Sequence, residues 1–270
     1  MSTSIRIPAV AGTFYPADPA QLQAEVRAFM AGDNDPVPVL GCVVPHAGYM
    51  YSGHVAGALY ARIEVPRVCI LMCPNHTGRG HGLSIMSRGY WATPLGRVAI
   101  DEALAESLKE SCPELTEDAD AHRFEHSAEV QLPFLQVRHP HPAIVPIAVG
   151  TWQPELLSSL GDAIAAAVSA HPERVLIIAS SDMNHYESDA VTRIKDQKAI
   201  RQVLALQPQA LHETVQREDI SMCGMGPTFV MLTAANALGA TSAELVRYAT
   251  SGDISGDRDR VVGYASIIVQ

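Results

Sequence analysis

The stretch RVCILMCPNH, residues 67–76, is an apolar run that stops at Pro74 and is followed at once by His76. A continuous apolar run, as opposed to one that alternates with polar residues, is typical of a strand covered on both faces. Similar runs occur at 41–45, 143–150 and 174–182, and further strand candidates at 82–86, 97–100, 243–249 and 260–269. These runs predict a sheet that is largely parallel and buried inside the molecule.

Helical patterns separate the strand candidates, at 18–32, 101–112, 125–138, 153–170, 190–206 and 226–239. The first begins with Asp18 as a cap and Pro19 in the first turn, and Pro133 should kink or split the third. The chain contains no linker rich in proline, serine or glycine. We therefore expect a single α/β domain over residues 1–270, a three-layer αβα arrangement with a mixed, largely parallel central sheet.

Composition and charge narrow the class of protein. The 270 residues are 47% hydrophobic and 18% charged, and the formal net charge is −10 with no cluster of Lys or Arg. Proteins that grip nucleic acid or anionic lipid usually carry a basic stripe, so we expect neither partner. The absence of a signal peptide and of a membrane-length apolar stretch, with an odd number of cysteines, predicts a cytoplasmic protein with reduced thiols. Cys69 and Cys73 are expected in the core.

Polar side chains follow three of the buried runs where each run ends. His46 follows the first run, His76 follows the second, and the run at 174–182 leads into Asp182 and His185. Ligands of open α/β sheets bind outside the carboxyl ends of the strands, so neighbouring strands would bring these groups together. One histidine at a strand end is more often a hydrogen-bonded loop residue, but several at equivalent positions favour a metal or catalytic site.

Two further motifs offer reactive side chains. His126 and Glu129 are three residues apart in a predicted helix and so share one face, where His126 could transfer protons or bind substrate. The same stretch could equally cap the helix through Glu125 and Ser127. Cys223 precedes two glycines and a helix, a setting that lowers a thiol pKa and suits a ligand or nucleophile, although a buried cysteine in a tight turn is the simpler interpretation.

Several other motifs are weaker candidates for a functional site. His54 and His81 lie near the candidate loops and could support the site, whereas the remaining histidines in predicted turns or a polar helix are assigned structural roles: His139, His141, His171 and His212. The Gly/Asp stretch at 251–260 misses the spacing of a calcium loop and predicts a turn. No phosphate-binding glycine loop and no serine-hydrolase elbow occurs.

The motifs, taken together and in order, resemble those of the Memo family. They are RIPAVAGTFYPADPAQL, VVPHAGYMYSGHVAGALY, CPNHTG, WATPLGRVAID, EHSAEVQLPFLQ, SSDMNHY, CGMGP and YATSGDISGDRDRVVGYAS, and they span nearly the whole chain. Memo proteins are similar in fold to the class III extradiol ring-cleavage dioxygenases, which implies that fold here. In bacteria and archaea they are described as protein B of the AmmeMemoRadiSam system, which implies an AMMECR-type protein and a radical SAM protein as partners.

The resemblance also implies roles for individual residues. The family's metal-binding positions correspond to His46, His76 and Cys223. Its nearby reactive groups, in catalytic roles, correspond to Asp182, His185 and His126. Many relatives carry Arg where this chain has Met225, so a cation that could hold an anionic substrate is missing at that position.

These residues predict a metal-binding protein with a dioxygenase-like site for a small molecule. Two imidazoles and a third ligand would leave open positions for substrate and oxygen on Fe(II), the metal we expect. The third ligand is Cys223 or, if the thiol stands aside, Asp182. A thiolate is a softer ligand, which makes Cu or Zn the alternatives. The other functions considered are a zinc hydrolase with a metal-activated water, and a non-catalytic protein whose pocket receives a metal, a peptide or a partner.

Overall fold

A computed structural model describes residues 4–32 and 35–270 of the chain. The apolar run at 67–74 forms β3, Val68–Pro74, in the middle of a sheet that contains twelve strands within those residues. The others are β1 Ile5–Arg6, β2 Gly41–Val44, β4 Leu83–Ile85, β5 Tyr90–Thr93, β6 Gly96–Ile100, β7 Thr116–Glu117, β8 Ala143–Val149, β9 Val175–Ser180, β10 His185–Glu187, β11 Ala243–Thr250 and β12 Val261–Val269. The strands missing from the prediction are short: β1, β5, β7 and β10.

The sheet is mixed, and its centre is parallel. β6, β8, β3, β9 and β2 lie side by side in that order and run parallel. β12 joins antiparallel to β2 and pairs in turn with β10 and β11, while β5 joins antiparallel to β6 at the other end. Strands from both ends of the chain thus share one sheet, and the predicted largely parallel centre is confirmed.

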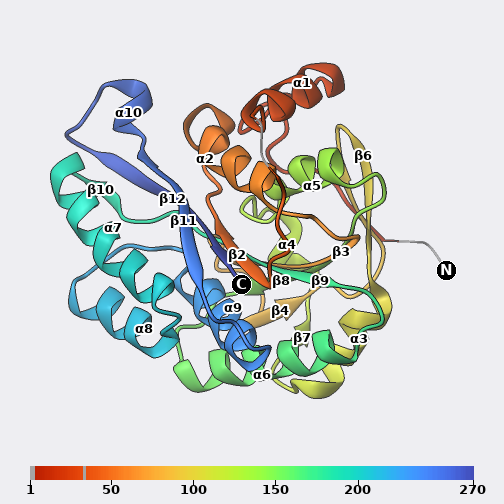
Figure 1. Ribbon diagram of the computed structural model, residues 1–270. Coiled ribbons are helices and arrows are strands. Elements are labelled where there is room, and N and C mark those ends of the chain that lie inside the picture. The colour runs from red at the N-terminus through yellow and green to blue at the C-terminus, as the bar shows by residue number, and fades with distance from the viewer. Residues whose placement is uncertain (1–3, 33–34) are drawn as a thin grey trace.

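Helices cover both faces of the sheet, which confirms the three-layer prediction (Figure 1). α1, α2 and α5 pack together on one face, where α2 also contacts β2, β11 and β12. α9 contacts β2, β3 and β9 on the other face, and α6 and α8 pack against α9. The helices are α1 Pro19–Phe29, α2 Tyr49–Arg62, α3 Glu102–Ser111, α4 Asp120–Arg123, α5 Leu132–Arg138, α6 Pro154–Ala170, α7 Asp189–Leu204, α8 Pro208–Arg217, α9 Met225–Ala237 and α10 Gly252–Ser255.

The predicted helix at 125–138 is split. A single 3₁₀ turn, η1 Glu129–Gln131, precedes α5, and Pro133 lies in the first turn of α5, where its missing N–H costs nothing. Residues 125–128 are outside both elements. The expectation that His126 and Glu129 share a helix face is therefore wrong, because the helical turns begin only after His126.

α2 is absent from the predicted helices because its sequence is interrupted by Gly53 and Gly57, which weaken a helical pattern. Both glycines face Phe29 of α1. A Cβ at either position would lie 2.5 Å from atoms of that residue. The two glycines therefore let α1 and α2 approach closely, and tertiary packing outweighs their low helix propensity.

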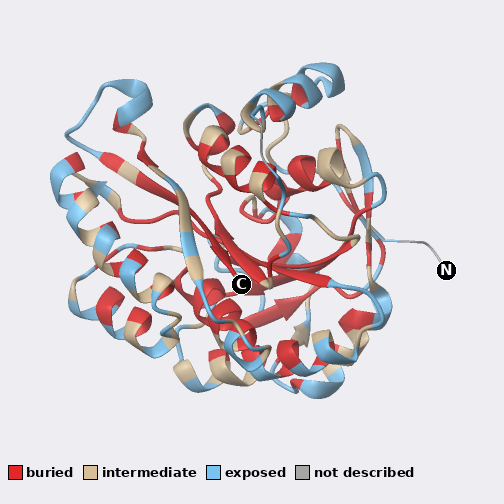
Figure 2. Ribbon diagram, viewed as in Figure 1, coloured by how far each residue is buried: buried red, intermediate tan, exposed pale blue. Residues whose placement is uncertain are grey.

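The core lies along the parallel strands, whose residues are coloured as buried in Figure 2. β3, β8 and β9 are buried over their full lengths, as the continuous apolar runs predicted. Cys69 and Cys73 are 0% exposed, which confirms them as core residues, and the five cysteines are free thiols. Among the described residues, no helix combines the length and the apolar composition that a membrane crossing would need.

Asp196 of α7 should make stability depend on pH. Its buried carboxyl accepts hydrogen bonds from the Asn184 N–H (2.8 Å) and the Tyr248 hydroxyl (2.7 Å), yet burial outweighs both and raises its pKa to about 7. The folded state thus keeps a proton that the unfolded chain releases, so stability falls as pH rises from about 4 to about 7. Between pH 5 and pH 8 the wild type should lose about 2 to 3 kcal/mol relative to Asp196→Asn.

Urea unfolding of both proteins at the two pH values measures this difference. Asp162→Asn is the matched control, because Asp162 lies on the exposed side of α6. This substitution should change the free energy of unfolding by no more than about 0.5 kcal/mol at either pH. If the difference in free energy of unfolding between wild type and Asp196→Asn is the same at both pH values, the prediction is wrong.

Candidate metal centre

Three strands bring the predicted site together. β9 lies between β3 and β2, so the loops that follow these strands leave the sheet at one edge. His46 follows β2, His76 follows β3, and Asp182 follows β9. One ligand atom each from His46, His76 and Cys223 lies within 4.8 Å of the other two, so this group could hold a metal ion.

Cys223 reaches the strand ends from the turn before α9. Its Sγ lies 3.2 Å from His46 Nε2 and 3.7 Å from the Asp182 carbonyl. The next residue, Gly224, donates its N–H to Ser181 Oγ at 3.1 Å, and a Cβ on Gly224 would lie 2.3 Å from the Ser181 Cβ. A glycine at 224 is thus required for the turn to sit against the end of β9.

The protonation of Cys223 differs from the prediction. Burial raises the pKa of the Cys223 thiol well above its usual value, and the Asp182 carboxyl raises it further. The helix N-terminus therefore does not activate this thiol on its own. A bound cation is what would ionise it, because a metal ion lowers the pKa of a coordinating thiol.

His46 is held in a buried setting and is 2% exposed. Its Nδ1 lies 2.9 Å from Ser180 Oγ. Burial lowers the pKa of His46 well below its usual value, and the neighbouring His76 and His126 lower it further. The ring is therefore neutral at pH 7, the state in which an imidazole can bind a metal.

His76 lies against the buried carboxyl of Glu125, with Nδ1 to Oε1 at 2.9 Å and the backbone N–H to Oε2 at 2.6 Å. Burial alone would raise the pKa of Glu125, but hydrogen bonds from His76 and Ser127 outweigh it and hold that pKa at about 2. Burial alone would lower the pKa of His76, but Glu125 raises it above its usual value. His76, Glu125 and His126 form a second group whose spacing could hold an ion.

Asp182 lies beside His46 as the other candidate for third ligand. One carboxyl oxygen accepts the His46 backbone N–H at 2.8 Å, and the other lies 3.9 Å from His46 Nε2. Burial raises the Asp182 pKa to about 7, against the lowering effect of that hydrogen bond. The three-ligand grouping contains Cys223 and not Asp182, so spacing favours the thiol.

The other two predicted catalytic residues also line this space. The His126 ring stacks on the His76 ring with centroids 4.8 Å apart and lies 4.8 Å from the Phe14 ring. His185 Nδ1 lies 2.8 Å from the Ser221 carbonyl, which can only accept, so Nδ1 carries the proton and Nε2 is free. Burial lowers the pKa of both histidines, and both are therefore mostly neutral at pH 7.

These groups surround a pocket of about 620 Å³, a size suited to a small molecule. All six predicted site residues line it. The prediction missed several others, none of which carried a metal-ligand or acid–base signal in the sequence: Phe14, Tyr186, Ser221, Val262 and Tyr264. Tyr186 has a left-handed backbone, φ 62°, and lies between His185 and Glu187, where the pairing of β10 with β12 is irregular.

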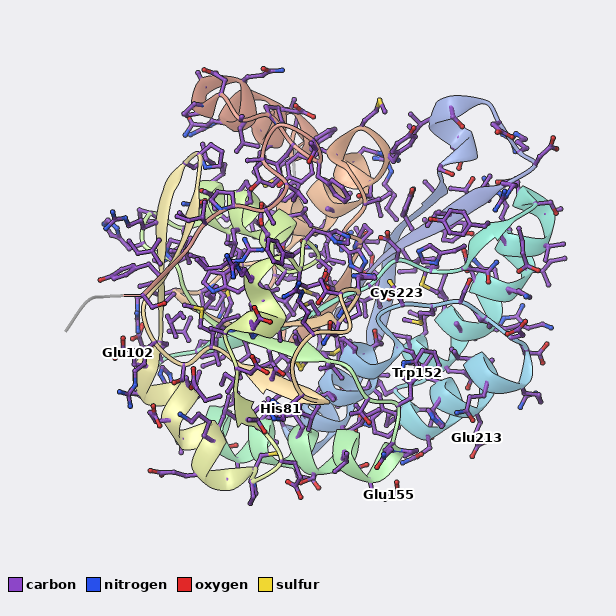
Figure 3. All side chains as sticks on the ribbon, turned by 180° about the vertical axis from the view of Figure 1, so that it is seen from behind. His81, Glu102, Trp152, Glu155, Glu213 and Cys223 are labelled. Carbon is purple, nitrogen blue, oxygen red and sulfur yellow. The ribbon has the colours of Figure 1, made fainter. Side chains whose placement is uncertain are left out.

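Several sequence candidates do not belong to the pocket. His81 is exposed and pairs with Asp118, Nδ1 to Oδ2 at 3.0 Å, and it lies apart from Cys223 in Figure 3. Neither His81 nor His54 lines the pocket. Met225 is 0% exposed and is also absent from the lining of the pocket.

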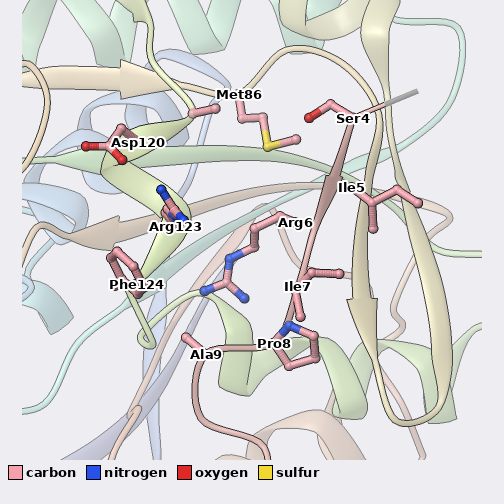
Figure 4. A pocket seen from close by; sticks show the side chains of 11 residues that line it. Ser4, Ile5, Arg6, Ile7, Pro8, Ala9, Met86, Asp120, Arg123 and Phe124 are labelled. Carbon is pink, nitrogen blue, oxygen red and sulfur yellow. The ribbon is translucent and has the colours of Figure 1, made fainter. Parts of the chain in front are cut away.

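A buried arginine secures the loop that carries Glu125 and His126. Arg6 of β1 donates to the carbonyl oxygens of His122 (2.9 Å) and Glu125 (2.6 Å) and forms an ion pair with Glu129. The outer side of this arginine lines a second cleft of about 640 Å³ between β1 and α4, shown in Figure 4. The cleft does not include the candidate ligands, and it lies where the N-terminal strand approaches α4.

Comparison with known proteins places the chain in a family. The family model described as Memo-like protein matches residues 6–268. A MEMO1 family protein of Methanosarcina barkeri is 44% identical over 268 residues, covering 98% of this chain and 100% of the relative. A MEMO1 family protein of Methanopyrus kandleri is 41% identical over 277 residues, covering 97% and 98%.

Among solved structures, an uncharacterized protein of Escherichia coli K12 matches with a TM-score of 0.56. It is 14% identical, and the match covers 84% of this chain and 98% of the other, so it supports the α/β fold alone. The sequence relatives carry the stronger conclusion, since they match over almost the full length of both chains. The chain belongs to the Memo family.

Proposed function

We propose that the protein binds one transition-metal ion through His46, His76 and Cys223 and carries out redox chemistry on a small molecule held in the adjoining pocket. The observation that carries this proposal is the convergence of three ligand atoms within 4.8 Å on the wall of a pocket of about 620 Å³. Two imidazoles and a thiolate suit Fe(II), and they also suit Cu(I) and Zn(II). Fe(II) is proposed because three protein ligands leave positions open for substrate and an oxidant.

The metal would supply Lewis acidity and a redox centre. The protein would supply the proton chemistry around it. His185 is neutral with its Nε2 unprotonated, so it is suited to accept a proton from a substrate hydroxyl. The Asp182 carboxyl, whose pKa is about 7, can hold or release a proton near neutral pH. Phe14 and His126 lie together on the pocket wall, where they would orient a planar substrate.

The test of the reaction is metal analysis followed by activity. Protein purified without chelators and without a metal-binding tag should contain iron, and anaerobic Fe(II) reconstitution should permit oxygen uptake with catechols or other enediols. No uptake across a broad panel would count against the oxygenase function. Native zinc together with amidase or esterase activity would point instead to a hydrolase that uses a metal-activated water.

Cys223→Ser tests the ligand set separately from turnover. A serine hydroxyl is a poor ligand for soft metals, so the variant should bind metal at least about 10-fold more weakly than wild type. Competition with a chelator of known affinity measures the change. If Cys223→Ser keeps its metal and Asp182→Asn loses it, the third ligand is Asp182.

The family resemblance also supplies partners to try. We propose an AMMECR-type protein and a radical SAM protein as the first candidates for pull-down experiments with the metal-loaded chain. A His46→Ala bait tests whether such binding depends on the site. Partners captured equally by both baits would argue against a role for the pocket in recognition.

A further inference from the structure

We propose that the loop at 125–127 positions both candidate metal-binding histidines, and that Glu125 acts on His76 as a positioning residue, not as a metal ligand. The inference rests on the metal site proposed above and deepens it. In each imidazole the loop determines which nitrogen is unprotonated, and so able to bind a metal, before an ion is present. The inference also decides between the two groupings of side chains that could hold an ion, since both contain His76.

The carboxylate of Glu125 accepts four hydrogen bonds from donors within the protein, two of them from His76. Its Oε1 accepts from His76 Nδ1 (2.9 Å), the Ser127 N–H (3.0 Å) and the Ser127 hydroxyl (2.6 Å). Its Oε2 accepts the His76 backbone N–H at 2.6 Å. Three of these four donors meet Oε1, so coordination through that oxygen would break hydrogen bonds of a side chain that is 0% exposed. Oε2 is held by the His76 backbone, so Glu125 is already oriented toward His76 through both of its oxygens.

The same contact fixes the tautomer of His76. An ionised carboxylate can only accept, so the proton of the ring is placed on Nδ1. In the neutral ring the other nitrogen, Nε2, is then left without a proton and is free to bind an ion. A carboxylate that accepts from the second nitrogen of a metal-binding histidine orients the ring and raises its basicity. Glu125 is such a carboxylate for His76, because it accepts the hydrogen bond from Nδ1.

His46 is fixed by a longer chain of hydrogen bonds that starts from the same loop. The Ser180 hydroxyl donates to the Ser127 carbonyl at 2.7 Å, and its oxygen accepts from Gln131 Nε2 at 3.1 Å. The Gln131 amide is oriented because its Nε2 also donates to the Pro45 carbonyl at 2.9 Å. The Ser180 hydroxyl proton is therefore used in the hydrogen bond to the Ser127 carbonyl. Toward His46, Ser180 Oγ can only accept a hydrogen bond, which Nδ1 donates.

Both rings consequently carry their proton on Nδ1 and present Nε2. In His46 that nitrogen lies 3.2 Å from Cys223 Sγ, on the side where the ion would bind. The loop is itself held from behind, since Arg6 donates to the Glu125 carbonyl at 2.6 Å. Ligand geometry set in advance lowers the entropy that metal binding must overcome.

Glu125→Gln tests the inference. A glutamine of the same shape has one acceptor oxygen, so it cannot satisfy both donors of His76 and loses the charge that assists them. Zn²⁺, which needs no control of redox state, is the probe, and chelator competition gives its affinity. We expect Glu125→Gln to bind Zn²⁺ about 10- to 100-fold more weakly than wild type. In the metal-free proteins, at a pH high enough to keep His76 neutral, ¹⁵N NMR of the imidazoles should show His76 with its proton on Nδ1 in wild type and a mixture of tautomers in the variant.

Glu129→Gln is the matched control, because Glu129 is in the next turn, is 0% exposed and also accepts several hydrogen bonds, but contacts neither histidine through them. It should keep wild-type Zn²⁺ affinity and the His76 tautomer at temperatures where it is folded. Equal losses in both variants, or an unchanged tautomer in Glu125→Gln, would overturn the inference. If wild type itself binds no Zn²⁺ and no Fe(II), the proposed metal site fails; if wild type and Glu125→Gln bind equally well, only this inference fails.

Discussion

His46→Ala should lose its metal almost completely. The imidazole is the most deeply buried of the three candidate ligands, and its Nε2 lies 3.2 Å from Cys223 Sγ, so alanine at this position would leave the proposed site with two of its three ligands. Loss of an outer partner of a ligand typically costs 10- to 100-fold in metal affinity, and loss of the ligand itself should cost more than about 100-fold. Metal content per chain after anaerobic purification, with chelator competition, measures the effect.

His81→Ala is the control for His46→Ala. His81 is an exposed imidazole in the loop that follows β3, bonded to Asp118 and outside the pocket, so its removal should leave metal content unchanged. The second grouping, His76 with Glu125 and His126, contains no His46 and would survive the first substitution. A His46→Ala protein that keeps a full complement of metal would therefore move the site to that grouping.

The candidate site could be approached from the sequence because its residues stand at strand ends. β2, β3 and β9 are continuous apolar runs, and each is followed within two residues by a histidine or carboxylate. Strand order was not available from the sequence, since 100 residues, 75–174, separate β3 from β9. The three strand ends lie close together because β9 lies between the other two strands, and only the folded sheet shows that neighbourhood.

What the sequence could not show were features that depend on tertiary contacts. The spacing of His126 and Glu129 indicated one helix face, but Pro133 starts α5 only after both residues. Glu129 faces Arg6 from β1 instead, a contact across 123 positions of sequence. The sequence indicates only a helix-capping role for Glu125 for the same reason: its partner His76 belongs to another loop. The raised Cys223 pKa likewise follows from burial, which spacing does not report.

Arg6→Met should be the most destabilising of the substitutions considered. The Arg6 guanidinium is buried with Glu129, which also accepts the backbone N–H groups of Ala9 and Val10 and the hydroxyl of Tyr15. Arg6 further lies 4.4 Å from the centre of the Trp91 ring. Removing it leaves a buried carboxylate without its cation, which typically costs 3 to 5 kcal/mol. Urea unfolding at pH 7 should show a loss of about that size.

Arg62→Met is the matched control, because Arg62 pairs with Glu244 at the surface, where the two side chains are 33% and 52% exposed. Such a pair contributes about 0 to 1 kcal/mol, so the control should stay close to wild type. The double variant Arg6→Met, Glu129→Gln separates the causes. If the unpaired carboxylate dominates, removing its charge should recover part of the loss and make the two substitutions non-additive. Strict additivity would instead assign the cost to the hydrogen bonds that Arg6 gives the loop of Glu125, and metal affinity should then fall together with stability.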